Sequence, residues 1–187
     1  MTIVYLHGFN SAPQSHKART LAQYMTARGV GDRFACPKLP HRPAAAIALA
    51  QGEIARATKP VTLVGSSLGG FYATYLAEQH DLRAALLNPA VTPQLDLESY
   101  LGTQRNLYTG EVYELTRAHI DEWRALECIT IRPDRYLLLV ETGDEVLDYR
   151  EAVRKYAGAR QIVVEGGDHT LRSFTDHLPT IVQFAGL

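Results

Sequence analysis

The sequence predicts an α/β fold in which helices flank a mostly parallel, six-stranded sheet. Short apolar runs rich in β-branched residues, typical of strands buried on both faces, alternate with amphipathic helical patterns. The chain has 187 residues and contains no internal repeat, which indicates a single domain over 1–187. The predicted strands are residues 2–6, 33–39, 61–65, 83–88, 135–141 and 161–166.

Helical patterns occupy the segments between most of these strands. In residues 15–29 apolar side chains recur every three to four positions, and Gly29 stands where a C-terminal cap is expected. Pro43 suits the first turn of the second helix. The other predicted helices are 42–58, 68–79, 148–157 and 171–185.

Composition and charge exclude several classes of partner. The formal net charge is −1 and no basic cluster is present, so neither nucleic acid nor an anionic membrane surface is an expected partner. The apolar N-terminal run is too short for a signal peptide, and no stretch reaches the length of a membrane span. We therefore expect a cytoplasmic protein without membrane insertion.

The stretch "VGSSLGG" contains the pattern Gly-x-Ser-x-Gly, formed by Gly65, Ser67 and Gly69. It lies between a predicted strand and a predicted helix, the setting in which this pattern places a nucleophilic serine on a sharp turn. The flanking glycines leave room for the backbones to pass closely. Ser66 does not satisfy the pattern. An ordinary glycine-rich turn between a strand and a helix is the alternative.

A serine hydroxyl needs a positioned base, and a histidine base needs a carboxylate. His169 follows the last strand, and it alone among the histidines fits the hydrolase order of serine, acid and then histidine at the carboxyl edge of the sheet. Asp144 follows strand 135–141 in a glycine-containing loop and is the predicted acid. Asp148 fits the N-cap of the next helix instead.

The oxyanion of an acyl-transfer reaction needs two N–H donors. One is expected from Leu68, directly after the nucleophile, and the other from Phe9 in the loop after the first strand, with Asn10 as the second choice. His7 is expected to shape this loop by local hydrogen bonds. No ligand spacing indicates a metal site.

Residues 92–134 interrupt the alternation of strands and helices. This segment is predicted to contain no strand and to form a helical cap. One amphipathic helix is expected from its apolar positions, Val112, Leu115, His119, Trp123 and Leu126. Its apolar face should bury against the mouth of the active site. We therefore expect Leu115, Trp123 and Asn10 to line a substrate pocket, although Trp123 could instead simply pack the cap onto the domain.

Five blocks of sequence resemble the YqiA-type esterases of the α/β-hydrolase superfamily. The blocks are "YLHGFNSAPQSHKA", "GSSLGGFYA", "LLNPAVTP", "TGDEVLDYREA" and "GGDHTLRSF". The resemblance implies esterase or thioesterase activity on small acyl substrates, without a cofactor. It also implies that Ser67, Asp144 and His169 form the triad.

The sequence leaves other functions open. A non-catalytic binding protein on a hydrolase fold is one alternative, because a fold alone does not establish catalysis. A serine peptidase using the same residues is another. An ester or thioester is the preferred substrate class because nothing in the sequence indicates a cleft for an extended peptide.

Overall fold

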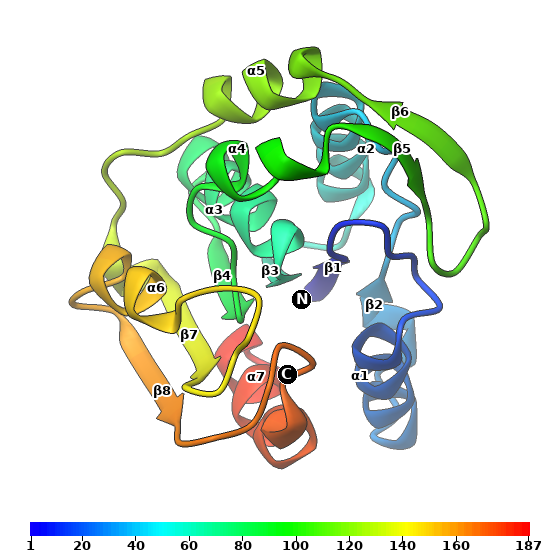
Figure 1. The fold of residues 1–187 in the computed structure, drawn as a ribbon. Helices are drawn as coiled ribbons and strands as arrows, with labels where there is room; N and C mark the ends of the chain where they lie inside the picture. Colours follow the sequence, from blue (N-terminus) through cyan, green and yellow to red (C-terminus); the bar gives the residue numbers. More distant parts are fainter.

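The computed structural model describes residues 1–187 and contains a six-stranded sheet in which every neighbouring pair of strands is parallel. The strand order is β2-β1-β3-β4-β7-β8 (Figure 1). All six predicted strands are therefore present. Five differ from the prediction by at most two residues at an end, whereas the strand expected over 33–39 is reduced to two residues. Their bounds are β1 Thr2–Leu6, β2 Phe34–Ala35, β3 Val61–Ser66, β4 Arg83–Leu87, β7 Tyr136–Glu141 and β8 Arg160–Val164.

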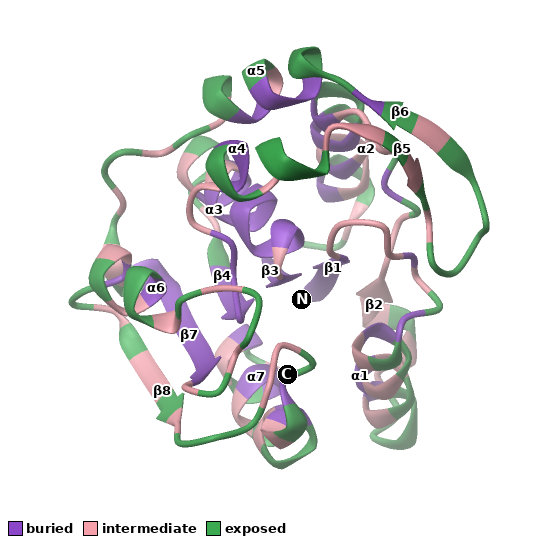
Figure 2. Cartoon of the chain, viewed as in Figure 1, coloured by how far each residue is buried: buried purple, intermediate pink, exposed green.

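Helices cover both faces of the sheet, and each face has its own apolar core. On one face α1 (His16–Ala27) and α7 (Leu178–Ala185) pack against strand residues such as Tyr5 and Leu139. On the other face α2 (Pro43–Arg56), α3 (Leu68–His80) and α6 (Tyr149–Lys155) pack against the alternate strand residues. The strands of the sheet centre are buried along their length except for Arg83 at the start of β4 (Figure 2). None of the helices has the length and apolar character that crossing a membrane would require.

The strand order brings two loops of the predicted site together. The sequence-adjacent strands β1 and β2 lie on one side of β3, and the chain then continues on its other side with β4. In this register Leu6 at the end of β1 lies beside Gly65 near the end of β3. Ligand sites of open parallel sheets form at such a switch point, beyond the carboxyl ends of the strands.

The prediction that residues 92–134 contain no strand is wrong. The segment holds a short helix, α4 (Pro93–Asp96), an antiparallel hairpin of β5 (Gly102–Arg105) and β6 (Val112–Leu115), and then α5 (Arg117–Ala125). The single helix expected from Val112 onward is therefore a strand followed by a helix. Alternating exposure along β6 buries only Leu115 fully, and such a short strand is easily mistaken for part of a helical stripe.

Candidate active site

Ser67 occupies a strained turn between β3 and α3. Its φ of +54° and ψ of −124° lie where residues with a side chain are rarely found. Backbone hydrogen bonds stabilise this strained conformation: the Ser67 N–H donates to the Leu87 carbonyl, and the Ser67 carbonyl accepts the N–H groups of Gly70 and Ala90. Ser67 is also the N-cap of α3, so its hydroxyl lies at the positive end of that helix.

The two glycines of the motif are required by crowding. A Cβ atom on Gly69 would overlap the carbonyl oxygen of Leu6, and one on Gly65 would overlap the carbonyl oxygen of Gly69. Both obstacles are backbone atoms, which cannot move away as a flexible side chain could. The small residues therefore let α3 start directly against the ends of β1 and β3.

His169 bridges Ser67 and Asp144 by hydrogen bonds. Its Nε2 lies 3.1 Å from the Ser67 Oγ, and its Nδ1 lies 2.8 Å and 3.0 Å from the two carboxylate oxygens of Asp144. The ionised carboxylate only accepts hydrogen bonds, so Nδ1 carries the proton and Nε2 is left to accept one from the serine. The structure thus brings together the three residues predicted from three separate loops.

The Asp144 carboxylate is desolvated and well supplied with donors. Its side chain is 2% exposed, and Oδ1 also accepts the N–H groups of Val146 and Leu147 at 2.9 Å. Burial alone would raise the pKa of Asp144, but the hydrogen bonds from His169 and these N–H groups lower it below its ordinary value. Asp148, by contrast, caps α6 by accepting the N–H of Arg150, as predicted.

Two buried side chains that the sequence analysis did not assign hold the loop that carries His169. Glu141, 1% exposed, accepts the N–H groups of Asp168 and Arg172 on one carboxylate oxygen and that of Ser173 on the other. Burial would raise the pKa of Glu141, but these hydrogen bonds lower it. The signal available in the sequence was a charged residue directly ending the apolar run "LLLV".

Asn88, at the end of β4, ties the same loop to the sheet. Its side-chain oxygen accepts the N–H of Glu141 at 3.0 Å, and its side-chain nitrogen donates to the carbonyl of Asp168 at 3.1 Å. It is 2% exposed and has a positive φ of +41°. A polar residue that ends the apolar run "AALL" is again the sequence signal.

The loop after β1 is fixed by His7, as predicted. The His7 Nε2 accepts the N–H of Leu39 at 3.0 Å, so Nδ1 carries the proton and donates to the carbonyl of Gly8 at 3.1 Å. That carbonyl shares a planar peptide unit with the N–H of Phe9, so the histidine also fixes the direction of this N–H. Burial lowers the pKa of His7, which favours the neutral ring that the arrangement needs.

Two cavities meet at Ser67 and His169, and Phe9 lines both. One, of about 400 Å³, is lined by more apolar than polar residues, and the other, of about 300 Å³, is lined mostly by polar residues; they are called the apolar cavity and the polar cavity below. The apolar cavity is lined also by Leu68, Ala90, Pro93, Asp96, Leu97, Ser99, Tyr100, Val146 and Leu147. The part of segment 92–134 that reaches this cavity is therefore α4 and the turn after it.

The residues expected in the substrate pocket lie in different places. Leu115 and Trp123 line neither cavity; both are buried in the core, and the Trp123 indole N–H donates to the Tyr72 hydroxyl at 2.8 Å. Trp123 reaches the site only through its edge contact with Phe9, whose ring centroid is 6.5 Å away. Asn10 lines the polar cavity.

The model of an uncharacterised protein family, UPF0227, matches residues 2–186 of the chain. The chain belongs to the UPF0227 family. The matched range includes every residue of the candidate site, from the loop after β1 to the loop after β8.

Solved structures share the fold of this UPF0227 member at low sequence identity. One is a protein of Agrobacterium vitis S4 named provisionally as a hydrolase, with a TM-score of 0.79, 21% identity, and coverage of 98% of this chain and 87% of that chain. Mouse α/β hydrolase domain-containing protein 10 has a TM-score of 0.75 and 15% identity, with coverage of 97% and 88%. Est1E of Butyrivibrio proteoclasticus has a TM-score of 0.67 and 16% identity, with coverage of 98% and 86%. The chain therefore has the α/β-hydrolase fold.

Proposed function

We propose that the protein is a serine hydrolase that cleaves carboxylic esters or acyl thioesters of small molecules through an acyl-enzyme intermediate. The observation that carries the proposal is the 3.1 Å approach of the His169 Nε2 to the Ser67 Oγ, with Ser67 in a strained turn beside an apolar cavity. A carboxylate-oriented histidine against a serine at a helix N-terminus is an arrangement suited to acyl transfer.

In the first half of the reaction Ser67 becomes acylated. His169 takes the hydroxyl proton on Nε2 while the Ser67 Oγ forms a bond to the acyl carbon, and the carbonyl oxygen becomes an oxyanion. The N–H groups of Leu68 and Phe9 donate to this oxyanion; that of Leu68 belongs to the first turn of α3 and has no partner within the helix. The bond to the leaving group then breaks, and His169 protonates the departing oxygen or sulfur.

In the second half water replaces the leaving group. His169 removes a proton from the water, whose oxygen bonds to the acyl carbon and forms the oxyanion again. When the oxyanion collapses, the bond between the acyl carbon and the Ser67 Oγ breaks, His169 returns its proton to Ser67, and the carboxylic acid leaves. Asp144 keeps the Nδ1 proton of the ring in place and stabilises the positive charge that forms on His169 in each half. The cycle uses no cofactor.

The apolar cavity is suited to the acyl chain. Its walls come from α4, from the turn after α4 and from the loop after β7, and they include Leu97, Tyr100 and Leu147. In this proposal segment 92–134 serves as the cap of a single domain, but through these residues and not through Leu115 or Trp123. The sequence resemblance to YqiA-type esterases and the fold shared with Est1E support the same reaction class.

Turnover of an aryl ester by two neighbouring serine variants tests the proposal. We expect Ser67→Ala to abolish hydrolysis of 4-nitrophenyl butyrate and Ser66→Ala to retain it, because only the Ser67 hydroxyl contacts His169. Circular dichroism spectra of both variants control for folding. Full activity in Ser67→Ala, or loss only in Ser66→Ala, would exclude this nucleophile. Cleavage of aminoacyl amides in preference to esters would favour a peptidase.

A further inference from the structure

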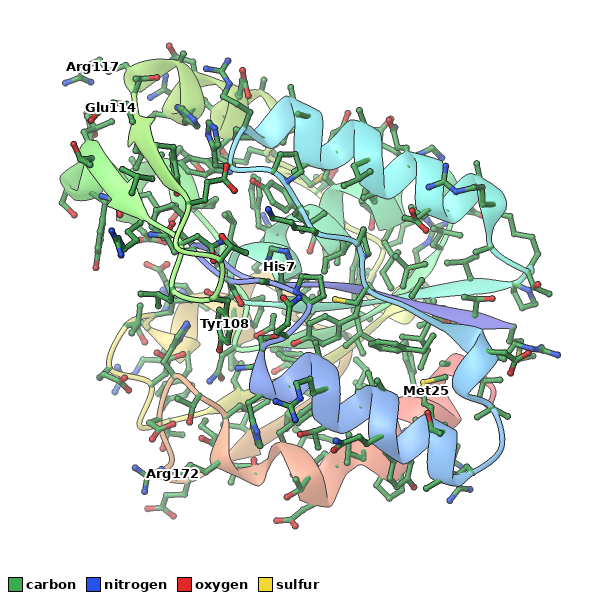
Figure 3. The ribbon with its side chains drawn as sticks, turned by 90° about the vertical axis from the view of Figure 1, so that its right-hand side faces the viewer. His7, Met25, Tyr108, Glu114, Arg117 and Arg172 are labelled. Carbon is green, nitrogen blue, oxygen red and sulfur yellow. The ribbon has the colours of Figure 1, made fainter.

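The polar cavity shares Phe9, Ser67 and His169 with the apolar cavity. It is lined by the loop after β1, the start of α1, the tip of the β5–β6 hairpin and Thr170 after His169. Figure 3 shows Tyr108, at the hairpin tip, on the same side of the molecule as His7 and near the start of α1. Because Ser67 and His169 line both cavities, a substrate whose carbonyl is at Ser67 would extend into both.

Hydroxyl groups dominate the polar wall. Besides Ser67, they belong to Tyr5, Ser11, Ser15, Ser66, Tyr108 and Thr170, and the Thr170 hydroxyl already donates to Asp168. Tyr5 is 1% exposed and Ser15 is 8% exposed, so both are nine-tenths buried at the cavity wall. Ser15 is the N-cap of α1, yet its side chain makes no capping hydrogen bond with the helix. A capping serine that does not cap leaves its hydroxyl available to a ligand.

The charges near the cavity partly balance one another. Lys17, whose ammonium group donates to the Thr170 carbonyl at 3.1 Å, lines the cavity and would repel a cation. Burial lowers the pKa of Lys17 to about 8, while the nearby carboxylates of Asp144, Asp168 and Glu141 act in the opposite direction. These three carboxylates do not line the cavity, but they partly balance the charge of Lys17.

We propose that the polar cavity binds a neutral, polyhydroxylated leaving group, such as a glycerol or sugar moiety, while the acyl chain occupies the apolar cavity. The proposal rests on the esterase function proposed above. Hydroxyl groups both donate and accept hydrogen bonds, so they match a wall of hydroxyls better than a group that can do only one of these. Hydrogen bonds between the hydroxyls of the leaving group and those of the cavity wall would discriminate against an alcohol of the same length without hydroxyls.

Matched butyrate esters test the inference. Propyl butyrate and 1-monobutyrin differ only by two hydroxyl groups in the leaving alcohol, and 3-(butyryloxy)propanoate adds a carboxylate instead. We expect wild-type kcat/KM to be highest for 1-monobutyrin. Ser15→Ala and Tyr108→Phe should each lower the ratio of 1-monobutyrin to propyl butyrate by about three- to ten-fold, the value of one hydrogen bond.

Comparing each variant with the wild type cancels the intrinsic reactivity of the esters. Tyr24→Phe is the matched control, because Tyr24 lies on α1 outside the cavity and its hydroxyl contacts only Arg28. An unchanged ratio in both cavity variants, with hydrolysis intact, overturns the inference but not the esterase function. A wild-type preference for the carboxylate ester that disappears in Lys17→Met also overturns it, in favour of an anion site.

A binding measurement separates this inference from the proposed function. Saturation-transfer NMR on the Ser67→Ala variant compares binding of 1-monobutyrin and propyl butyrate without turnover. Stronger binding of 1-monobutyrin that is lost with Ser15→Ala supports the cavity even if the wild type hydrolyses neither ester. Equal binding of the two esters contradicts it.

Discussion

At the residue scale, the turn at Ser67 depends on two glycines, because the structure has no space for a side chain at either position. Gly69→Ala would drive a methyl group into the backbone carbonyl of Leu6, which is held in the sheet by the pairing of β1 with β3. We expect this variant to lose at least about 3 kcal/mol of unfolding free energy or to fail to fold. Gly52→Ala, in α2, meets only the flexible Arg56 side chain and should stabilise the protein by about 0.5–1 kcal/mol. Chemical denaturation of both variants checks the contrast, and equal stabilities would refute the crowding.

Loss of charge at the two aspartates after β7 should affect different properties, kcat for Asp144 and stability for Asp148. Asp144→Asn removes the acceptor that fixes the Nδ1 proton of His169, so kcat should fall by several orders of magnitude, about 10⁴-fold in the protease precedent. Asp148→Asn should cost about 1 kcal/mol of stability or less and leave kcat near that of the wild type, since its carboxylate caps α6. Steady-state kinetics and thermal melts of the two variants test this, and a reversed pattern would assign the acid to Asp148.

At the scale of elements, the loop after β8 is fixed to the sheet by Glu141. Glu141→Gln would place an amide against N–H donors, and we expect it to lower the unfolding free energy by about 2–4 kcal/mol at neutral pH. Because the folded-state pKa of Glu141 is lowered, its contribution is complete above the ordinary value of 4.5 and is lost as pH falls through the folded-state pKa. Denaturation of wild type and variant as a function of pH should therefore give curves that converge only below about pH 4.5. A gap that does not change with pH would show that the Glu141 charge has no such role.

The segment 92–134 contributes to the site through some of its elements and to the core through others. Leu97→Ala enlarges the apolar cavity and should change relative kcat/KM across an acyl-length series by about ten-fold or more. Trp123→Phe removes the hydrogen bond to Tyr72 and part of a fully buried ring, so it should lower the unfolding free energy by about 1–3 kcal/mol without altering that preference. An acyl preference that shifts in Trp123→Phe and not in Leu97→Ala would reverse these roles.

At the scale of the whole molecule, the parts that sequence predicts are those that local patterns specify. Most of the six strands are recognisable as continuous apolar runs, whereas the pattern over 33–39, interrupted by Pro37, corresponds to only two strand residues. The order of strands then places Ser67, Asp144 and His169 at one edge of the sheet. The β5–β6 hairpin was not predictable in the same way, because it is short, half-exposed and joined directly to α5. The roles of Glu141 and Asn88 depend on contacts with a loop more than 25 residues away, which no local pattern encodes.

The central claim is that Ser67 is the nucleophile, and covalent labelling tests it most directly. The protein is incubated with a fluorophosphonate, and the modified residue is located by mass spectrometry of the peptide that contains both Ser66 and Ser67. The account predicts one adduct per chain, located on Ser67, and none in Ser67→Ala. An adduct on Ser66, or an unmodified wild-type protein, would contradict it.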